Sequence, residues 1–421
     1  MCYLPMMKNQ FRKFVCLWIF TGTAFAQMGS YSYSRKVEGI ESNNYYAIPI
    51  DPATASRMSF EKNDVRLYRV GTDTAEVPYL FESFGRKVEK TEMAFDVVNQ
   101  SYNAQGWYYF TFEQPQVRKV NYIELHFQRA NFDLRIDLEG SMDQRDWRSI
   151  EQNARIVSLQ NEFVSYEYTT LHFTPSNYKF FQVVVKSADP SWKLHLETAS
   201  VYDWVERDGR YDELPIGEWK QEENKKDHIS EVILPMKAAY PVSQLTMKIK
   251  NEKDYYRSLK IYYSKELVKT ERGEIENWIY VSDYMISSLE PVRVDLGGIK
   301  TDKIKLQILN RNDQPLAIEE IHLKSEACRM IAELESGKNY FLAYGKSYET
   351  APQYDLVYFK EKIPSNVTEA HLGVESVIEK IIEPKGTPLF ENPLWLWSIM
   401  IVVILLIGGY SIKMLKTVKK N

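Results

Sequence analysis

Cysteine is scarce in this chain, and its scarcity excludes a disulfide-stabilised fold. The 421 residues include three cysteines, Cys2, Cys16 and Cys328. The first two lie in an N-terminal segment that we expect to be removed, which leaves Cys328 without an intramolecular partner. We therefore expect the fold to depend on buried apolar side chains rather than on disulfides.

The chain also lacks the excess of basic residues that nucleic-acid binding requires. Its formal net charge is −4, and its markedly basic segment is the short tail 413–421. A protein without a basic field has no electrostatic attraction for a phosphate backbone. We expect no nucleic-acid partner.

Sequence motifs of enzymes are missing as well. The sequence has no Gly-x-Ser-x-Gly elbow and no His-Glu-x-x-His helix, which are common signatures of hydrolases. We therefore predict a non-enzymatic protein with no cofactor and no bound metal. The alternative is a carbohydrate-active enzyme with dispersed carboxylates, because a catalytic pair needs to meet only in space.

One long uncharged apolar run is present, and it predicts a transmembrane helix at 394–412. About 19 residues that rise 1.5 Å each match the hydrocarbon core of a bilayer, which is roughly 30 Å thick. Trp395 and Trp397 are typical interfacial anchors at one end, and the basic tail 413–421 at the other end is typical of the cytoplasmic side.

The N-terminus predicts the matching half of this topology. Residues 1–26 have a basic start, an apolar centre and the small-residue pattern Ala24-Phe25-Ala26, as signal peptides do. We therefore expect a single-pass protein of the inner (cytoplasmic) membrane with a periplasmic or otherwise extracytoplasmic ectodomain and a cytoplasmic C-terminus.

Helical periodicity is rare between these two segments, and the alternation of apolar and polar residues predicts an all-β ectodomain. In the clearest strand, Ile123, Leu125 and Phe127 point one way while the polar residues between them point the other,. The ectodomain is too long for one compact core, so we expect several domains. The first is a smaller N-terminal β unit, residues 27–90.

The strand pattern of residues 91–205 recurs in residues 206–325, which predicts a tandem duplication. The corresponding positions are Ile123, Leu125, Phe127, Ser141 and Trp147 in the first copy and Leu245, Met247, Ile249, Ser264 and Trp278 in the second. A strand that ends in Ser, a polar turn and a Trp resembles the discoidin-like, galactose-binding-type jelly roll. The resemblance implies two β-sandwiches with these tryptophans packed inside.

The segments after the second copy are harder to assign. Residues 326–375 predict an additional β segment that either pairs with the N-terminal unit or packs on the second sandwich. Residues 366–382 have Val374, Val377 and Ile378 at helical spacing, which favours a helix,. Residues 376–393 predict a linker, because Pro and Gly interrupt their end.

Two tryptophans, Trp107 and Trp192, are the candidate ligand contacts. Each lies near a predicted loop, where an indole ring could stack on the face of a sugar; the alternative is that they close the ends of the sandwich. Among the six histidines, His126, His172 and His195 lie in strands of one unit. Without a close pair, we interpret them as surface residues rather than zinc ligands.

Several short segments are similar to those of an uncharacterised bacterial family of envelope proteins, catalogued as a domain of unknown function. These segments are Tyr33-Ser34-Arg35, Asp64-Val65-Arg66-Leu67-Tyr68, Val77-Pro78-Tyr79, Asn131-Phe132-Asp133, Glu139-Gly140-Ser141 and Pro352-Gln353-Tyr354-Asp355-Leu356. The resemblance implies a signal peptide, a β-rich exterior and a C-terminal membrane span. It also implies a large multi-spanning membrane protein as a partner, and it defines no catalytic residue.

These observations predict a membrane-anchored binding or scaffolding module. Its ligand is either a membrane-protein partner or a cell-envelope polysaccharide. Protein partnership is favoured, because no predicted loop carries the dense aromatic and polar cluster of a sugar site.

Overall fold

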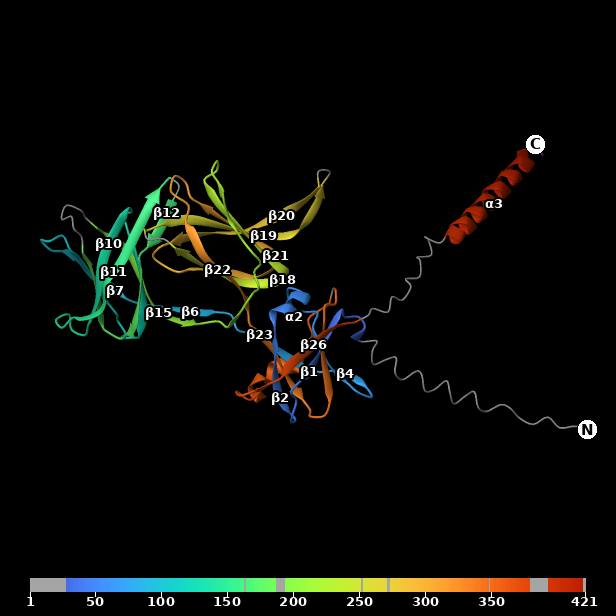
Figure 1. The fold of residues 1–421 in the computed structure, drawn as a ribbon, viewed down its shortest axis with the longest axis horizontal. Helices are drawn as coiled ribbons and strands as arrows, with labels where there is room; N and C mark the ends of the chain where they lie inside the picture. Colours follow the sequence, from blue (N-terminus) through green and yellow to red (C-terminus); the bar gives the residue numbers. More distant parts are fainter. Residues whose placement is uncertain are drawn as a thin grey trace, which may run out of the picture.

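The computed structural model of the chain describes residues 28–162, 164–186, 194–250, 253–270, 273–347, 349–378 and 393–418. The predicted signal peptide lies outside this described part. The structure is mostly β and contains three β units, as Figure 1 shows. We call them the first sandwich, the second sandwich and the terminal unit.

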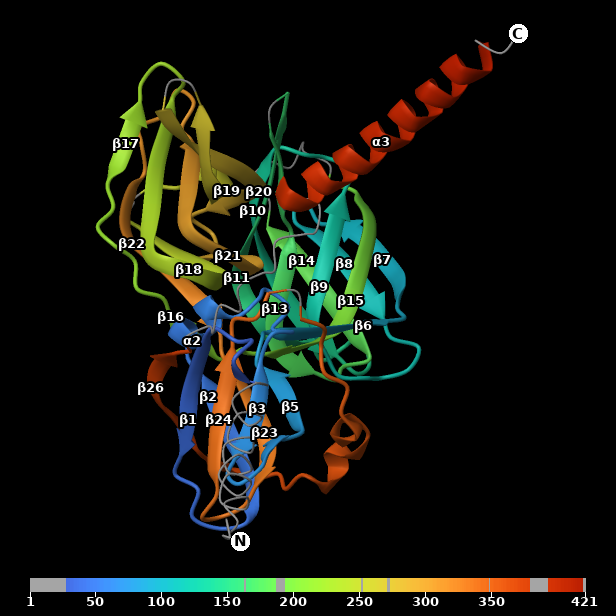
Figure 2. The same ribbon diagram turned by 90° about the vertical axis from the view of Figure 1, so that its right-hand side faces the viewer.

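The terminal unit is built from both ends of the ectodomain. Its strands are β1 (Tyr33–Glu38), β2 (Asn44–Ile50), β3 (Arg66–Val70), β4 (Thr74–Glu76), β5 (Tyr79–Ser83), β23 (Cys328–Leu334), β24 (Asn339–Tyr344), β25 (Thr368–Glu369) and β26 (His371–Val377). One sheet has the order β26-β1-β24-β3-β4 and the other β25-β2-β23-β5, and Figure 2 shows the blue and orange strands interleaved. The segment after 326 therefore completes the N-terminal unit, the first of the two arrangements left open by the sequence.

The first sandwich has two antiparallel sheets. Its strands are β6 (Lys87–Met93), β7 (Asp96–Tyr102), β8 (Tyr108–Glu113), β9 (Val120–Phe127), β10 (Phe132–Ser141), β11 (Arg148–Asn161), β12 (Val164–Tyr168), β13 (Thr170–Ser176), β14 (Phe180–Lys186) and β15 (Leu196–Arg207). The larger sheet has the order β12-β11-β10-β14-β8-β7, and the smaller has the order β13-β9-β15-β6.

The second sandwich uses fewer, longer strands. They are β16 (Tyr211–Glu213), β17 (Gln221–Asn224), β18 (Ile229–Lys250), β19 (Tyr256–Thr270), β20 (Gly273–Ser287), β21 (Val292–Leu309) and β22 (Ala317–Glu326). The register between β18 and β21 shifts after Pro235. Each of these two strands consequently contributes its two halves to different layers of the sandwich.

The two sandwiches share most of their pairing pattern, although the edge strand β12 of the first has no counterpart among the described strands of the second. The halves of β18 take the places of β8 and β9, and the halves of β21 take the places of β13 and β14. Likewise β19 and β20 pair as β10 and β11 do, and β16 pairs with β22 as β6 pairs with β15. The strand order that the sequence repeat predicts is therefore found in the hydrogen-bonded sheets.

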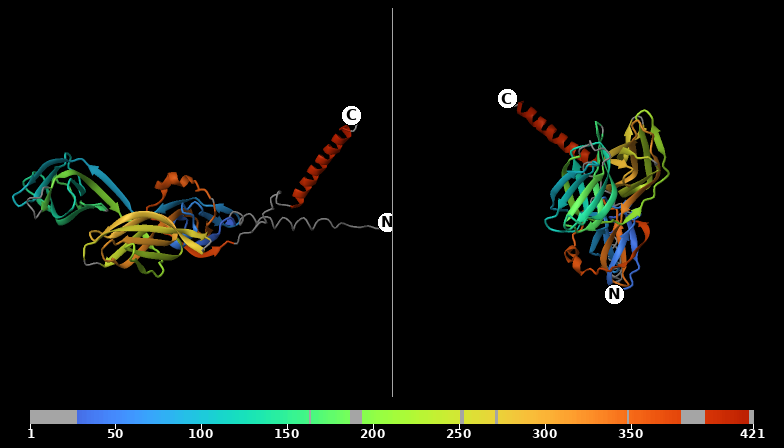
Figure 3. Two further views of the ribbon diagram at one scale, coloured as in Figure 1. Left: turned by 90° about the horizontal axis from the view of Figure 1, so that it is seen from above. Right: turned by 90° about the vertical axis from the view of Figure 1, so that its left-hand side faces the viewer.

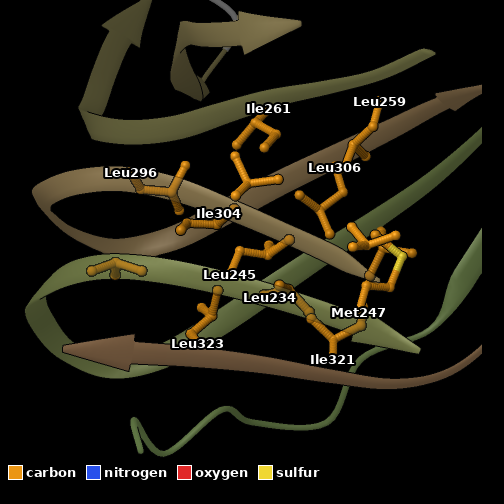
Figure 4. Packing of buried hydrophobic residues seen from close by; sticks show 14 of the residues in the cluster. Leu234, Leu245, Met247, Leu259, Ile261, Leu296, Ile304, Leu306, Ile321 and Leu323 are labelled. Atoms are coloured by element: carbon orange, nitrogen blue, oxygen red, sulfur yellow. The ribbon is translucent and has the colours of Figure 1, made fainter. Parts of the chain in front are cut away.

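Aliphatic side chains fill the core of the second sandwich (Figure 4). Leu245 and Leu323 are fully buried at positions that the repeat predicts to be internal. Trp147 and Trp278 do not belong to the described cores, and both are half-buried, so the prediction that they pack inside was wrong. Trp147 precedes β11 in a turn, and the ring of Trp278 lies under Lys305, whose Nζ is 4.5 Å from its centroid.

The helix predicted at 366–382 is also wrong, because residues 371–377 form strand β26. This strand pairs with β1, and the Arg35 side chain donates hydrogen bonds to the carbonyl oxygens of Leu372 (3.1 Å) and Gly373 (2.7 Å). Pairing with an existing sheet overrides the weak helical spacing. Residues 379–392, which include most of the predicted linker, lie outside the described part.

Helix α3 (Pro393–Val418) forms at the apolar run. The structure describes the side chains of Trp395 and of residues 397–413 in this helix. Within the part of the chain that is described, no helix is both long and apolar enough to cross a membrane. The helical part of the prediction for 394–412 is confirmed, and the membrane crossing stays a prediction.

The two sandwiches are inserted between β5 and β23 of the terminal unit. At the point of insertion, the chain segments around Phe84, Arg210 and Ala327 run side by side. Phe84 N donates to Ala327 O (3.0 Å), Arg210 N to Phe84 O (2.8 Å) and Ala327 N to Arg210 O (2.9 Å). We call this meeting of the three units the junction.

Candidate functional site

Trp107 lies in the tight turn between β7 and β8. The Asn103 side chain organises this turn, since its Oδ1 accepts hydrogen bonds from Gln105 N (3.0 Å) and Trp107 N (2.9 Å). Gly106 adopts the left-handed conformation, with φ of 82°, that glycine tolerates best,. The turn therefore holds the Trp107 backbone in place while 37% of the residue stays exposed.

One charged group lies near the Trp107 ring, and further polar groups lie in the same turn and on the adjoining strand. Lys186 Nζ lies 5.7 Å from the ring centroid and forms an ion pair with Asp137. On the next strand, the Tyr109 hydroxyl accepts a hydrogen bond from Asn103 Nδ2 (3.2 Å). An exposed ring beside donors and acceptors can contact a sugar through both its apolar face and its hydroxyl groups.

This surface lies at the end of the first sandwich opposite the junction. The first residue of β6, Lys87, pairs with the last residue of β15, Arg207, next to the junction. The opposite end of the same sandwich contains Lys186, the last residue of β14, and Leu196, the first residue of β15. Figures 1 and 3 show this sandwich, in teal and green, projecting away from the terminal unit. We call the end with Trp107 the far end.

Of the other candidate residues from the sequence, the structure describes some and not others. Trp192 lies outside the described residues. His126, on β9, has Glu124 and Glu167 as neighbours at 3.8 and 3.7 Å. Among the described residues, no group of three or more His, Cys, Asp or Glu side chains is arranged to hold a metal ion.

An aromatic cluster that the sequence pattern did not predict lies on the outer face of the smaller sheet. The rings of Tyr122 and Trp204 stack with centroids 4.9 Å apart, and Lys90 Nζ lies 3.8 Å from the Tyr202 centroid. The outward positions Tyr202 and Trp204 on β15 were the available signal. Lys90 also pairs with Glu124 at 3.2 Å. Tyr202 and Trp204 are half-buried, so the cluster leaves less open ring than Trp107 does.

His172 belongs to the same cluster, and its ring centroid lies 4.4 Å from that of Tyr122. His172 is exposed on β13, and partial desolvation of its imidazole by these rings lowers its pKa,. Burial also raises the pKa of the Tyr122 hydroxyl. At neutral pH both side chains are uncharged, which fits a packing role.

A short exposed apolar segment stands on the terminal unit. Val357, Tyr358 and Phe359 of the 3₁₀ helix η1 (Asp355–Lys362) are 47%, 83% and 49% exposed. No residue of η1 is buried, and Lys362 Nζ lies 4.5 Å from the Phe359 ring centroid. We call Val357, Tyr358 and Phe359 the η1 surface.

No protein-family profile and no curated protein matches this sequence, so the resemblance to an envelope-protein family finds no support there. Several solved structures are similar to this chain. The CBM32-1 and CBM32-2 domains of Clostridium perfringens ZmpB match with 8% identity over 67% of this chain and 100% of theirs, at a TM-score of 0.23. The same pair in complex with GalNAc matches with 9% identity over 68% and 98%, also at 0.23.

A fucolectin from the serum of the striped bass Morone saxatilis is a further similar structure. It matches with 8% identity over 60% of this chain and 97% of its own, at a TM-score of 0.18. All of these matches have sequence identities of 9% or less and TM-scores of 0.23 or less. At such identities and TM-scores, they carry no argument about ligand or activity.

Proposed function

We propose that this protein is a non-enzymatic binding protein whose first sandwich contacts a polysaccharide through its far end. The exposed Trp107 ring, in a hydrogen-bonded turn beside Lys186, is the observation that carries the proposal. A preorganised aromatic surface loses little conformational entropy when it stacks on a sugar ring. The neighbouring charged and amide groups supply partners for sugar hydroxyls.

The arrangement of the units supports this role. Both described ends of the ectodomain enter the terminal unit, and the sandwiches are inserted as an arm between β5 and β23. An arm of this kind presents its far end to a ligand at a distance from the chain termini. The polysaccharide is therefore contacted where Trp107 and Lys186 lie.

Replacement of Trp107 tests the proposal. We expect Trp107→Ala to weaken retention of the full-length protein on isolated cell-envelope polysaccharide by about tenfold or more, as loss of one aromatic stacking contact does. Trp107→Phe should restore part of the retention. Tyr358→Ala, which removes an exposed aromatic ring elsewhere, is the matched control and should bind as the wild type does.

Unchanged retention of Trp107→Ala would overturn the role of the far end. Trp192→Ala, measured in the same assay, decides whether the second sequence candidate contributes. Release of reducing sugar from the polysaccharide by the wild type would instead favour the alternative of a carbohydrate-active enzyme.

A second function is favoured by the η1 surface: docking to a membrane-protein partner. Three consecutive exposed apolar side chains beside lysines are suited to insertion into an apolar groove of another protein.

The location proposed for both functions is the periplasmic face of the inner membrane, and its support is the sequence of residues 1–26, 394–412 and 413–421.

Photocrosslinking in native membranes tests the docking function and the location together. We expect a photoreactive residue at Tyr358 to capture a multi-spanning membrane protein in the membrane fraction. The same residue at Val374, which is 88% exposed on β26, is the control and should capture none. Equal capture from both positions would contradict docking at η1, and recovery of the protein in the soluble fraction would contradict the location.

A further inference from the structure

A cavity of about 280 Å³ lies at the junction, and all three units line it. The terminal unit contributes Phe60 and Lys62, the start of the first sandwich contributes Arg86, and the second sandwich contributes Tyr211, Asp295 and Glu326. Interfaces between domains are frequent places for small-molecule sites. None of these residues belongs to the far end.

Three of the charged groups of the cavity make contacts with neighbouring residues. Arg86 forms two hydrogen bonds to Glu206, at 2.7 and 3.0 Å, and Lys62 Nζ lies 5.0 Å from the ring centroid of Phe81. Glu326 Oε1 accepts a hydrogen bond from Gly85 N at 2.8 Å. The wall of the cavity is therefore preorganised, with two cationic and two anionic side chains that balance in charge.

The apolar part of the cavity is an open aromatic ring at its rim. Phe60 is 62% exposed, so one face of its ring is accessible at the cavity. Across from it, Gly297 and Gly298 have φ of 64° and 80°, a conformation that disfavours any side chain. A Cβ at Gly298 would lie 4.0 Å from Phe60 Cε2, so glycine keeps the space beside the ring open.

We propose that the junction cavity binds a neutral sugar, either a free monosaccharide or the end residue of a glycan. The balanced charges disfavour a strongly charged ligand, because either sign would meet a like charge. Carboxylates accept hydrogen bonds from hydroxyl groups, and Arg86 and Lys62 donate to them. The Phe60 ring supplies the face on which a pyranose stacks, and the volume is at the small end for ligand sites, which suits one ring.

A sugar in this cavity contacts all three units at once. Because it binds the assembled junction and not its separated parts, it stabilises the arrangement by mass action. Binding at the junction is thus coupled to the orientation of the arm that carries Trp107. This coupling distinguishes the site from a second copy of the far-end surface.

Calorimetric titration of the full-length protein in detergent tests the proposal. The neutral probes are galactose, glucose and N-acetylglucosamine, and the charged probes are galacturonate and glucosamine. We expect at least one neutral probe to bind and to raise the unfolding temperature. Phe60→Ala and Asp295→Asn should each weaken that binding by about tenfold or more, whereas the surface controls Tyr280→Ala, at an aromatic residue that is 53% exposed, and Asp302→Asn should not.

Different results would overturn the junction site and the far-end function. Absence of binding by every neutral probe, or equal binding by wild type and both cavity variants, overturns the proposal, as does preference for a charged probe. Both variants should remain folded, because Phe60 and Asp295 are exposed, and circular dichroism checks this. Trp107→Ala should leave this binding unchanged, so failure of the far-end function and failure of the junction site are told apart. A short oligosaccharide of the same sugar distinguishes a glycan end from a free sugar.

Discussion

Gly209 is the residue on which the close approach of chain segments at the junction depends. A Cβ at this position would lie 2.6 Å from Arg86 N and 2.8 Å from Phe84 O. Both are backbone atoms that cannot move away as a flexible side chain does. Only glycine therefore allows the three segments to form their mutual hydrogen bonds.

Replacement of Gly209 should loosen the junction. We expect Gly209→Ala to lower the free energy of unfolding by about 1–3 kcal/mol, the usual cost of forcing extra atoms into a packed site. Chemical denaturation followed by tryptophan fluorescence measures this change. Gly71→Ala is the control, since its Cβ would meet no atom closer than 3.9 Å. A Gly209 variant as stable as this control would show that the junction tolerates separation.

Contacts with neighbouring strands determine the secondary structure of strand β26. Its residues have helical spacing, yet β1 offers an open edge, and the Tyr344 hydroxyl of β24 donates a hydrogen bond to Glu375 at 2.7 Å. In the resulting strand, Leu372 packs against the core of the terminal unit. Val374, which a helix would bury, is 88% exposed.

Two substitutions in β26 separate the strand from the predicted helix. We expect Leu372→Ala to destabilise the protein by about 1–2 kcal/mol, less than a fully buried leucine would cost because Leu372 is half-buried. Val374→Asp should change stability by less than about 0.5 kcal/mol, as exposed positions do. Thermal unfolding measures both. The reverse order of effects would favour a helix at 366–382.

At the scale of the whole molecule, the two sandwiches contact each other through polar groups and through the rings of Tyr166 and Tyr256, whose centroids are 4.6 Å apart. Arg155 of the first sandwich binds Asp133 of the same unit at 2.5 Å and Asp254 of the second sandwich at 2.7 Å. The Tyr166 hydroxyl lies 2.9 Å from Ser287 Oγ. Hydrogen bonds from Arg155 and Ser288 hold the pKa of Asp254 below its usual range.

The contact between the sandwiches should therefore weaken in acid. A depressed pKa means that Asp254 contributes to the contact above its unfolded pKa of about 4, and that the contribution is lost as pH falls through the lower folded value. We expect the radius of gyration from small-angle X-ray scattering to rise below about pH 4. Arg155→Gln should show the larger radius already at neutral pH. Equal radii for wild type and variant at neutral pH would contradict this role of the ion pair.

The sequence by itself determined the β class, the duplicated strand order and the apolar run that forms α3, because these follow from local alternation and repetition. Trp107 could be chosen as a candidate because an indole near a turn is visible in one short segment. The tertiary structure alone decided that residues 328–377 complete the terminal unit, that Trp147 and Trp278 lie outside the described cores, and that a cavity forms at the junction. Each of these depends on contacts between residues far apart in the chain, as between Gly85 and Glu326. Such contacts leave no periodic signal in either segment.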